Sequence, residues 1–332
     1  MDFYSKYLKY KSKYLGLKNN FSFMQNGGAL GTNLVWESAV EFGLNCNDSK
    51  AEKPRFPRDL NLSGWLKTDI KVNDKKLEVI KKSFEETGDK PILVAMGGIS
   101  TNSFCGSSEI IVKNVQLLKD KFKAIYIINT NEYKKEQGSA CNHKDAITEE
   151  LRERCKFMKE KENDIRRKMK ENIKNKDEYQ NYYDKLYGPE REFTDNLALD
   201  LHTLIKDKLK LTNVHLLGKC QGGSNVISVI STGDEIYKGL YLAVPGAAYN
   251  IEPLYKLSSK RLEDIAFIFG WNKNDDYGFG FNISINEKAV YDEEIGKLEE
   301  KKNVQLNYES YVFTPGNGHE INDDLIKKIA KA

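Results

Sequence analysis

The chain has 332 residues, 39% hydrophobic and 30% charged, enough for one large α/β domain with an insertion or for two domains. Its 52 basic residues nearly balance its 49 acidic ones, and a net charge of +3 argues against a nucleic-acid-binding field over the surface. Five widely spaced cysteines favour reduced thiols over a disulfide framework. No apolar run approaches the ~18 residues that span a membrane, and the first residues lack a signal-peptide core. We therefore expect a cytoplasmic protein without a transmembrane segment.

Residues 1–28 are predicted to form a basic helix and a linker. Apolar and aromatic residues recur among lysines at near-helical spacing from Tyr4 to Leu15, and Gln25-Asn26-Gly27-Gly28 is typical of a flexible joint. Such a helix docks on a protein partner, a membrane or a nucleic acid, or it packs on its own domain, which we favour. Its Tyr-Leu-Lys-Tyr-Lys-x-Lys-Tyr-Leu pattern resembles a segment that recurs at the N-termini of proteins from large DNA viruses infecting amoebae. That resemblance implies a viral origin, with the host cytoplasm or the virion as location.

The next part of the chain is predicted to supply the first strands of a sheet. Partial alternation of apolar and polar residues over 34–42, and again over 65–72, predicts two strands. The charged stretch 75–87 is typical of an amphipathic helix. The continuous apolar run 91–96 predicts a parallel strand that is buried on both faces.

Residues 131–193 are predicted to be an insertion. They follow a predicted helix over 107–119 and a predicted buried strand over 122–128. Their composition turns abruptly to Lys, Glu, Asp and Arg with alternating signs at helical spacing. We predict a helical cap over the site or helices at its side, and the alternative is a coiled or partner-binding arm. An arm that binds nucleic acid is disfavoured, because acidic residues nearly match basic ones.

The chain is organised around residues 214–225, Val-His-Leu-Leu-Gly-Lys-Cys-Gln-Gly-Gly-Ser-Asn. A short apolar run leads into Gly-x-Cys-x-Gly-Gly and an apolar helical pattern follows, so the sequence predicts a strand, a sharp turn and a helix. Gly218, Gly222 and Gly223 would leave room for a strained turn, since a Cβ there would clash. Cys220 would stand on the tip of that turn. The helix N-terminus behind its sulfur favours a thiolate and an oxyanion.

This arrangement resembles the nucleophile elbow of the α/β-hydrolase superfamily, with cysteine where most members have serine. The resemblance covers roughly residue 91 to the C-terminus. It implies that 29–332 form an α/β-hydrolase-like domain, in which helices flank a mostly parallel central sheet. In that family the residue after the nucleophile and a loop after an early strand supply the N–H groups of the oxyanion hole. By resemblance these donors are Gln221 and either Gly98 or Ile99.

Three further strands are predicted after the elbow helix, over 240–246, 265–270 and 308–313. Either Asp275 or Asp276 follows the second of these strands, and His319 follows the third. The order of cysteine, acid and histidine is the one that the family uses. In this chemistry the imidazole takes the thiol proton and later returns it, while the carboxylate holds the imidazole in the required tautomer.

A cysteine elbow is similar to that of the dienelactone-hydrolase group, which acts on lactones and esters through Cys-His-Asp. The chain departs from that pattern in its insertion and its N-terminal extension, and it has Met96 where many lipases and esterases have histidine. We expect cleavage of an ester, thioester or lactone, a small-molecule acyl substrate, through an acyl-enzyme. A cysteine peptidase or an acyltransferase would use the same triad. The alternative from another class is a catalytically inactive hydrolase fold that serves as a structural or interaction protein, such as a virion component.

We expect no metal site and no cofactor. Cys141-Asn142-His143 offers too few ligands for a metal ion, and the sequence has neither a phosphate-binding loop nor a dinucleotide glycine fingerprint. Of the other histidines, His215 lies within the elbow strand and is predicted to be in the core, and His202 lies in a predicted helix. The expected partners are the acyl substrate and, through the N-terminal helix or the insertion, a protein. No specific nucleic acid is expected.

Overall fold

The computed structural model describes residues 34–39, 62–84, 88–97, 108–130, 197–245, 251–275, 283–314, 316 and 318–332. The predictions for the N-terminal segment 1–28 and the insertion 131–193 lie outside the described residues. The same holds for Gly98, Ile99 and Asp276. Those predictions stay untested.

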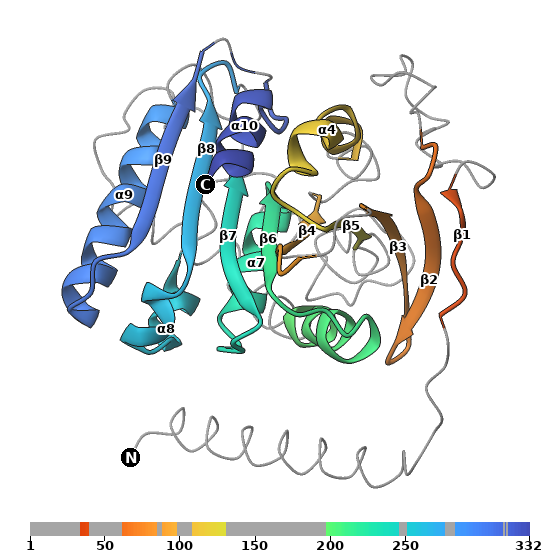
Figure 1. Ribbon diagram of the computed structural model, residues 1–332. Helices are drawn as coiled ribbons and strands as arrows, with labels where there is room; N and C mark the ends of the chain where they lie inside the picture. Colours follow the sequence, from red (N-terminus) through yellow and green to blue (C-terminus); the bar gives the residue numbers. More distant parts are fainter. Residues whose placement is uncertain are drawn as a thin grey trace, which may run out of the picture. The chain divides into compact units, whose positions relative to one another are not determined.

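The described residues form a nine-stranded sheet with the order β1-β2-β3-β5-β4-β6-β7-β8-β9 (Figure 1). From β1 to β5 neighbouring strands run antiparallel, and from β5 to β9 every neighbouring pair is parallel. The strands are β1 (Glu37–Ser38), β2 (Leu66–Val72), β3 (Lys75–Ser83), β4 (Ile92–Met96), β5 (Ala124–Asn129), β6 (Val214–Lys219), β7 (Tyr237–Ala243), β8 (Ala266–Asn272) and β9 (Asn307–Phe313).

Helices cover both faces of this sheet (Figure 1). On one face α4 and α10 pack together, and their apolar residues join Leu217 and Ile268 in one core cluster. Alternate strand residues point to the other face, where Phe269 packs edge-on against Tyr291 of α9 and where α7 lies against β6 and β7. The helices are α4 (Val115–Leu118), the π-helix η3 (Leu204–Lys208), α7 (Gln221–Ile230), the 3-10 helix η4 (Glu252–Lys256), α8 (Ser259–Glu263), α9 (Ile283–Lys302) and α10 (Asp323–Lys331).

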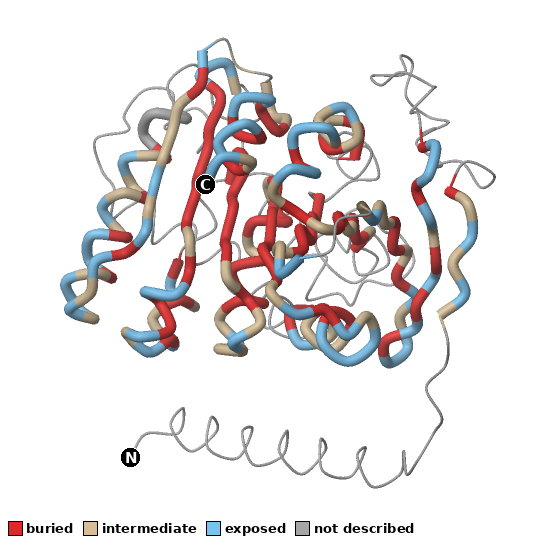
Figure 2. Tube along the Cα trace, in the orientation of Figure 1, coloured by how far each residue is buried: buried red, intermediate tan, exposed pale blue. Residues whose placement is uncertain are grey.

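The central strands are buried along their whole length, as Figure 2 shows by their red colour. Every residue of β4 and of β6 is buried. This burial accounts for the continuous apolar run of β4 and the mostly apolar sequence of β6, because a parallel strand with helices on both faces has no solvated side. The predicted α/β fold class, with a mostly parallel sheet flanked by helices, is confirmed.

The helix predicted over 75–87 is wrong, because Lys75–Ser83 is strand β3. It pairs with β2 across a two-residue turn, in which Asn73 takes a left-handed backbone with φ of 53°. Asparagine tolerates that conformation, and it is a turn signal between two alternating runs. Leu77 and Val79 are buried, while Glu78 between them and the lysines on either side are partly or fully exposed. The charges therefore belong to the solvated side of a strand.

The other predicted elements in the described ranges have shifted ends. The predicted helix over 107–119 is interrupted at Asn114, which separates helical residues 108–113 from α4. Of the strand predicted over 34–42, only Glu37–Ser38 is paired among residues 34–39. The predicted strands near β4 to β9 are all present.

Candidate active site

The site lies where the strand order changes direction. After β4 the chain continues to β5 on one side, and after β6 it continues to β7 on the other, although β4 and β6 are neighbours. Such a switch point leaves a crevice at the carboxyl ends of the two strands, which is where α/β proteins bind ligands. The predicted elbow follows β6, and the predicted oxyanion loop follows β4. The ends of β4 and β6, which precede the predicted loop and the predicted elbow, therefore lie side by side.

Cys220 occupies a sharp turn between β6 and α7. Its backbone has φ of 52° and ψ of −124°, a strained conformation for a residue with a side chain. The turn is held because the Cys220 N–H donates to Ala243 O at 3.1 Å, and the Gly223 N–H donates to Cys220 O at 2.8 Å. Cys220 is a free, partly exposed thiol. Its sulfur thus stands at the N-terminus of a ten-residue helix.

Two of the three predicted elbow glycines are required by close approach. A Cβ on Gly218 would lie within 2.6 Å of the Gly222 carbonyl group and of Val226. A Cβ on Gly222 would lie within 2.6 Å of the carbonyl oxygens of Met96 and Gly97. These contacts bring the end of β4 against the first turn of α7. Gly98 and Ile99, the predicted oxyanion donors, continue the chain from there beyond the described residues, and Gln221 is buried.

Gly223 differs from its neighbour, which gives a matched pair of variants. A Cβ on Gly223 would meet Pro245 at 3.5 Å and Leu242 at 3.6 Å, ordinary van der Waals distances. We expect Gly222→Ala to lower the free energy of unfolding by about 2–3 kcal/mol, because backbone atoms must move apart. Gly223→Ala should change it by less than about 1 kcal/mol, since alanine favours the helix. Denaturant unfolding of both variants checks this, and equal losses would contradict the proposed packing.

His319 and Asp275 contact each other directly. The Nδ1 atom of His319 lies 2.9 Å from Oδ2 of Asp275, and the two side chains are 19% and 11% exposed. Asp275 follows β8 and His319 follows β9, so both lie at the same edge of the sheet as Cys220. Of the two predicted acids, Asp275 is the one with a described contact to His319.

The protonation of His319 is coupled to both of its neighbours. Burial by itself lowers the pKa of His319, because the charged ring loses water. The hydrogen bond to Asp275 and the interactions with Cys220 and Asp275 outweigh this effect and raise the pKa of His319 to about 10. The structure therefore brings together Cys220, His319 and Asp275.

Sequence reasoning missed an ion pair beside these residues. The ammonium group of Lys219 contacts Oε2 of Glu320, and the side chains are 2% and 28% exposed. Lys219 precedes Cys220, and Glu320 follows His319, so the pair joins the elbow to the histidine loop. A lysine in a fully buried strand is a signal that a partner must exist, but it does not say which residue that is.

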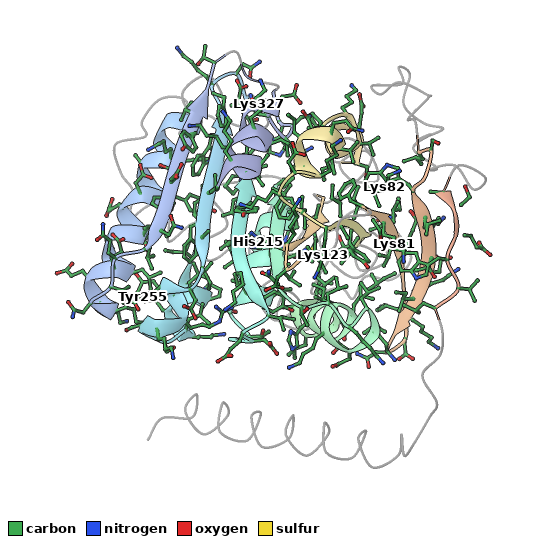
Figure 3. The ribbon with its side chains drawn as sticks, viewed as in Figure 1. Lys81, Lys82, Lys123, His215, Tyr255 and Lys327 are labelled. Atoms are coloured by element: carbon green, nitrogen blue, oxygen red, sulfur yellow. The ribbon has the colours of Figure 1, made fainter. Side chains whose placement is uncertain are left out.

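His215 lies in the core, as predicted, and it is separate from the site. Figure 3 labels it in the central part of the sheet, and its Nδ1 lies 2.5 Å from the hydroxyl of Tyr241. Burial and then the charge of Lys121 lower the pKa of His215 to about 3. The neutral ring is thus part of the folded core.

This histidine should make folding sensitive to acid. Its pKa is about 3 in the folded protein and about 6.5 in an unfolded chain, so its contribution is present above pH 6.5 and is lost as the pH falls toward 3. Relative to His215→Asn, which cannot titrate, wild type should lose about 3 kcal/mol of unfolding free energy between pH 7 and pH 4. Denaturant unfolding at several pH values measures the difference. Parallel curves would contradict the assignment.

Within the described ranges, no group of three or more His, Cys, Asp or Glu residues is arranged to hold a metal ion. None of the described helices is both long and apolar enough to cross a membrane.

No protein-family model and no curated protein sequence matches this chain. Among solved structures, Est1E from Butyrivibrio proteoclasticus shares 13% identity over 80% of this chain and 96% of its own, with a TM-score of 0.43. Carboxylesterase CesB from Bacillus subtilis shares 10% over 80% and 90%, with a TM-score of 0.41. A dienelactone hydrolase-like promiscuous phosphotriesterase from metagenomic libraries shares 10% over 75% and 80%, with a TM-score of 0.39. The site described above rests on this chain's own geometry.

Proposed function

We propose that the protein is a hydrolase that cleaves an ester, thioester or lactone through a Cys220-His319-Asp275 triad. The observation that carries this proposal is the 2.9 Å contact between His319 Nδ1 and Asp275 Oδ2, at the edge of the sheet where Cys220 occupies the elbow. A nucleophile, a base and a group that orients the base form the constellation that acyl transfer requires. The strained elbow and its helix N-terminus support the same assignment.

In the proposed mechanism the proton rests on His319, and the sulfur of Cys220 attacks the acyl carbon as a thiolate. The carbonyl π electrons move to oxygen, and the resulting tetrahedral intermediate collapses as the bond to the leaving group breaks. His319 gives its proton to that group, which leaves an S-acyl-enzyme. His319 then takes a proton from a water molecule that attacks the acyl carbon. Release of the acid returns the electron pair to sulfur, while Asp275 stabilises the imidazolium throughout.

The negative oxygen of the intermediate needs aligned donors. We assign this role to the backbone N–H of Gln221, at the start of α7, and to that of Gly98 or Ile99 on the loop after β4. The close approach of Gly222 to Met96 and Gly97 supports the assignment, because it sets the two segments side by side. Removing one such donor typically lowers the rate by a hundredfold or more.

The remaining predictions extend this proposal. We propose that the insertion 131–193 forms a helical cap over the site or helices at its side, and that it or the basic segment 1–28 is the part that a protein partner would contact. A cysteine peptidase or an acyltransferase would use the same triad with another substrate or acceptor. A catalytically inactive interaction protein needs no activated thiol, which separates it from all of these.

Trapping the acyl-enzyme tests the proposal. The intact protein is mixed with p-nitrophenyl acetate, an acetyl thioester and a lactone, and product release is followed together with intact-protein mass. We expect a burst of product with one acyl adduct, mapped to Cys220 by peptide mass spectrometry. Cys220→Ala should show neither, whereas Lys327→Ala, a substitution on α10, should match wild type. Absence of both turnover and adduct with every substrate would favour the interaction-protein alternative.

A further inference from the structure

Asn272 is a buried asparagine at the carboxyl end of β8, with 0% of its surface exposed. Its Nδ2 atom donates to two backbone carbonyls, to Gly318 O at 2.8 Å and to Glu320 O at 2.7 Å. These two residues flank His319 on either side. The Asn272 side chain is therefore hydrogen-bonded to the main chain of the histidine loop at the residues immediately before and after His319.

The orientation of this side chain is fixed by its hydrogen-bonding capacity. Both hydrogens of the Nδ2 group are used by carbonyls, which can only accept. The Oδ1 atom accepts a hydrogen bond from Asn322 Nδ2 at 2.8 Å, and Asn322 Oδ1 in turn caps α10 by accepting from the Asp324 N–H. A flipped amide would set oxygen against two carbonyl oxygens. The network thus has one arrangement, and it ties the loop to the start of α10.

The main chain of Asn272 contacts the turn that carries Asp275, the partner of His319. The carbonyl oxygen of Asn272 accepts a hydrogen bond from the Asp275 N–H at 3.0 Å. Nearby, Asn274 Oδ1 accepts from the Gly318 N–H at 3.1 Å. A Cβ on Gly316 would lie 2.6 Å from the Cβ of Asn272, so the loop passes directly over this residue. Asn272 therefore contacts both the turn that carries Asp275 and the loop that carries His319.

We propose that Asn272 is a positioning residue that sets His319 against Asp275 and, through it, against Cys220. The inference rests on the proposed function, because it assigns a role within the same triad. Asn272 touches no reacting atom. Its part is to keep the imidazole at the distance at which Asp275 accepts from Nδ1, at the edge of the sheet that carries Cys220. If the imidazole moves from this position, its interactions with Asp275 and Cys220 weaken.

The test uses the full chain and the reactivity of Cys220, with no substrate. Rates of iodoacetamide labelling are measured from pH 5.5 to 9.5 for wild type, Asn272→Ala and Asn272→Ser, together with the pKa of His319 by NMR of its ring protons. We expect wild type to label readily at pH 6.5. Asn272→Ala should be at least tenfold slower at pH 6.5 but equal to wild type at pH 9.5, with the pKa of His319 moved down toward 6.5. Asn272→Ser keeps one hydrogen-bond donor, so its labelling rate at pH 6.5 should lie between those of wild type and Asn272→Ala.

A control variant separates positioning from general destabilisation. Ser258→Ala removes the N-cap of α8, near the opposite end of β8, where Ser258 accepts from the Arg261 N–H. It should lower the melting temperature and leave the pH profile of labelling unchanged. If a folded Asn272→Ala or Asn272→Ser variant keeps the wild-type profile, Asn272 has only a structural role and the inference is overturned. If wild type itself does not label at pH 6.5, the proposed function fails and this inference falls with it.

Discussion

Turnover of an activated ester is expected to fall by about a thousandfold when His319 is replaced with alanine. The proposed chemistry uses His319 twice, first as the source of a proton for the leaving group and then as the base for water. Without the ring, the leaving group must depart unprotonated and Cys220 loses the positive neighbour that favours its charged form. Because the same group acts in both steps, acylation and deacylation should both slow. Stopped-flow measurement of the burst and of the steady state separates the two rates.

Two further variants, Asp275→Asn and the control His202→Gln, test whether the loss is specific to the triad. Asp275→Asn should give a loss of a hundredfold or more, since the amide would favour the wrong ring tautomer. His202 contacts the Tyr237 hydroxyl, away from the triad, so His202→Gln should retain activity within a factor of about three. If His319→Ala kept a tenth or more of the wild-type rate, the assignment of the base would be wrong.

Removing the carboxylate from the Lys219-Glu320 pair is expected to lower the free energy of unfolding by about 2–3 kcal/mol. The reason is the 2% exposure of Lys219, whose ammonium group would remain buried beside a neutral amide in Glu320→Gln. The loss should lie at or below the low end for fully buried pairs, because Glu320 is 28% exposed. Denaturant unfolding at neutral pH measures it.

Lys219 is much more deeply buried than Glu320, and this difference provides a control. Lys219→Met removes the buried charge and leaves a carboxylate that water reaches, so it should cost only about 1 kcal/mol. The double variant Lys219→Met with Glu320→Gln should be more stable than Glu320→Gln alone. A double variant that loses as much as the sum of the single variants would show that the two groups do not interact.

The sequence allowed the sheet and the elbow to be predicted because their signals are local. A continuous apolar run marked β4, a short apolar run marked β6, and glycines at fixed spacing around Cys220 marked a sharp turn. The order of Cys220, Asp275 or Asp276, and His319 predicted that the cysteine, the acid and the histidine lie at strand ends. Parallel strands bring those ends to one edge of the sheet, so strands that are predicted locally also place residues distant in the sequence near one another.

The errors and omissions have physical causes. The charges of 75–83 were interpreted as a helix face, although the turn at Asn73 and the alternation of buried residues specify a hairpin. The roles of Asn272 and Lys219 were not predicted at all. Their contacts join residues that are 46 and 101 positions apart, so nothing near either residue in the sequence names its partner.

The most direct test of the central claim is the pH dependence of iodoacetamide labelling at Cys220, followed by peptide mass spectrometry, in wild type and in His319→Ala. Our account predicts labelling of wild type well below the pKa of about 8.5 of a free thiol, and loss of that labelling without His319. A Cys220 that stays unreactive until the protein unfolds would contradict the account. The fold would then carry an inert thiol, as expected of an interaction protein.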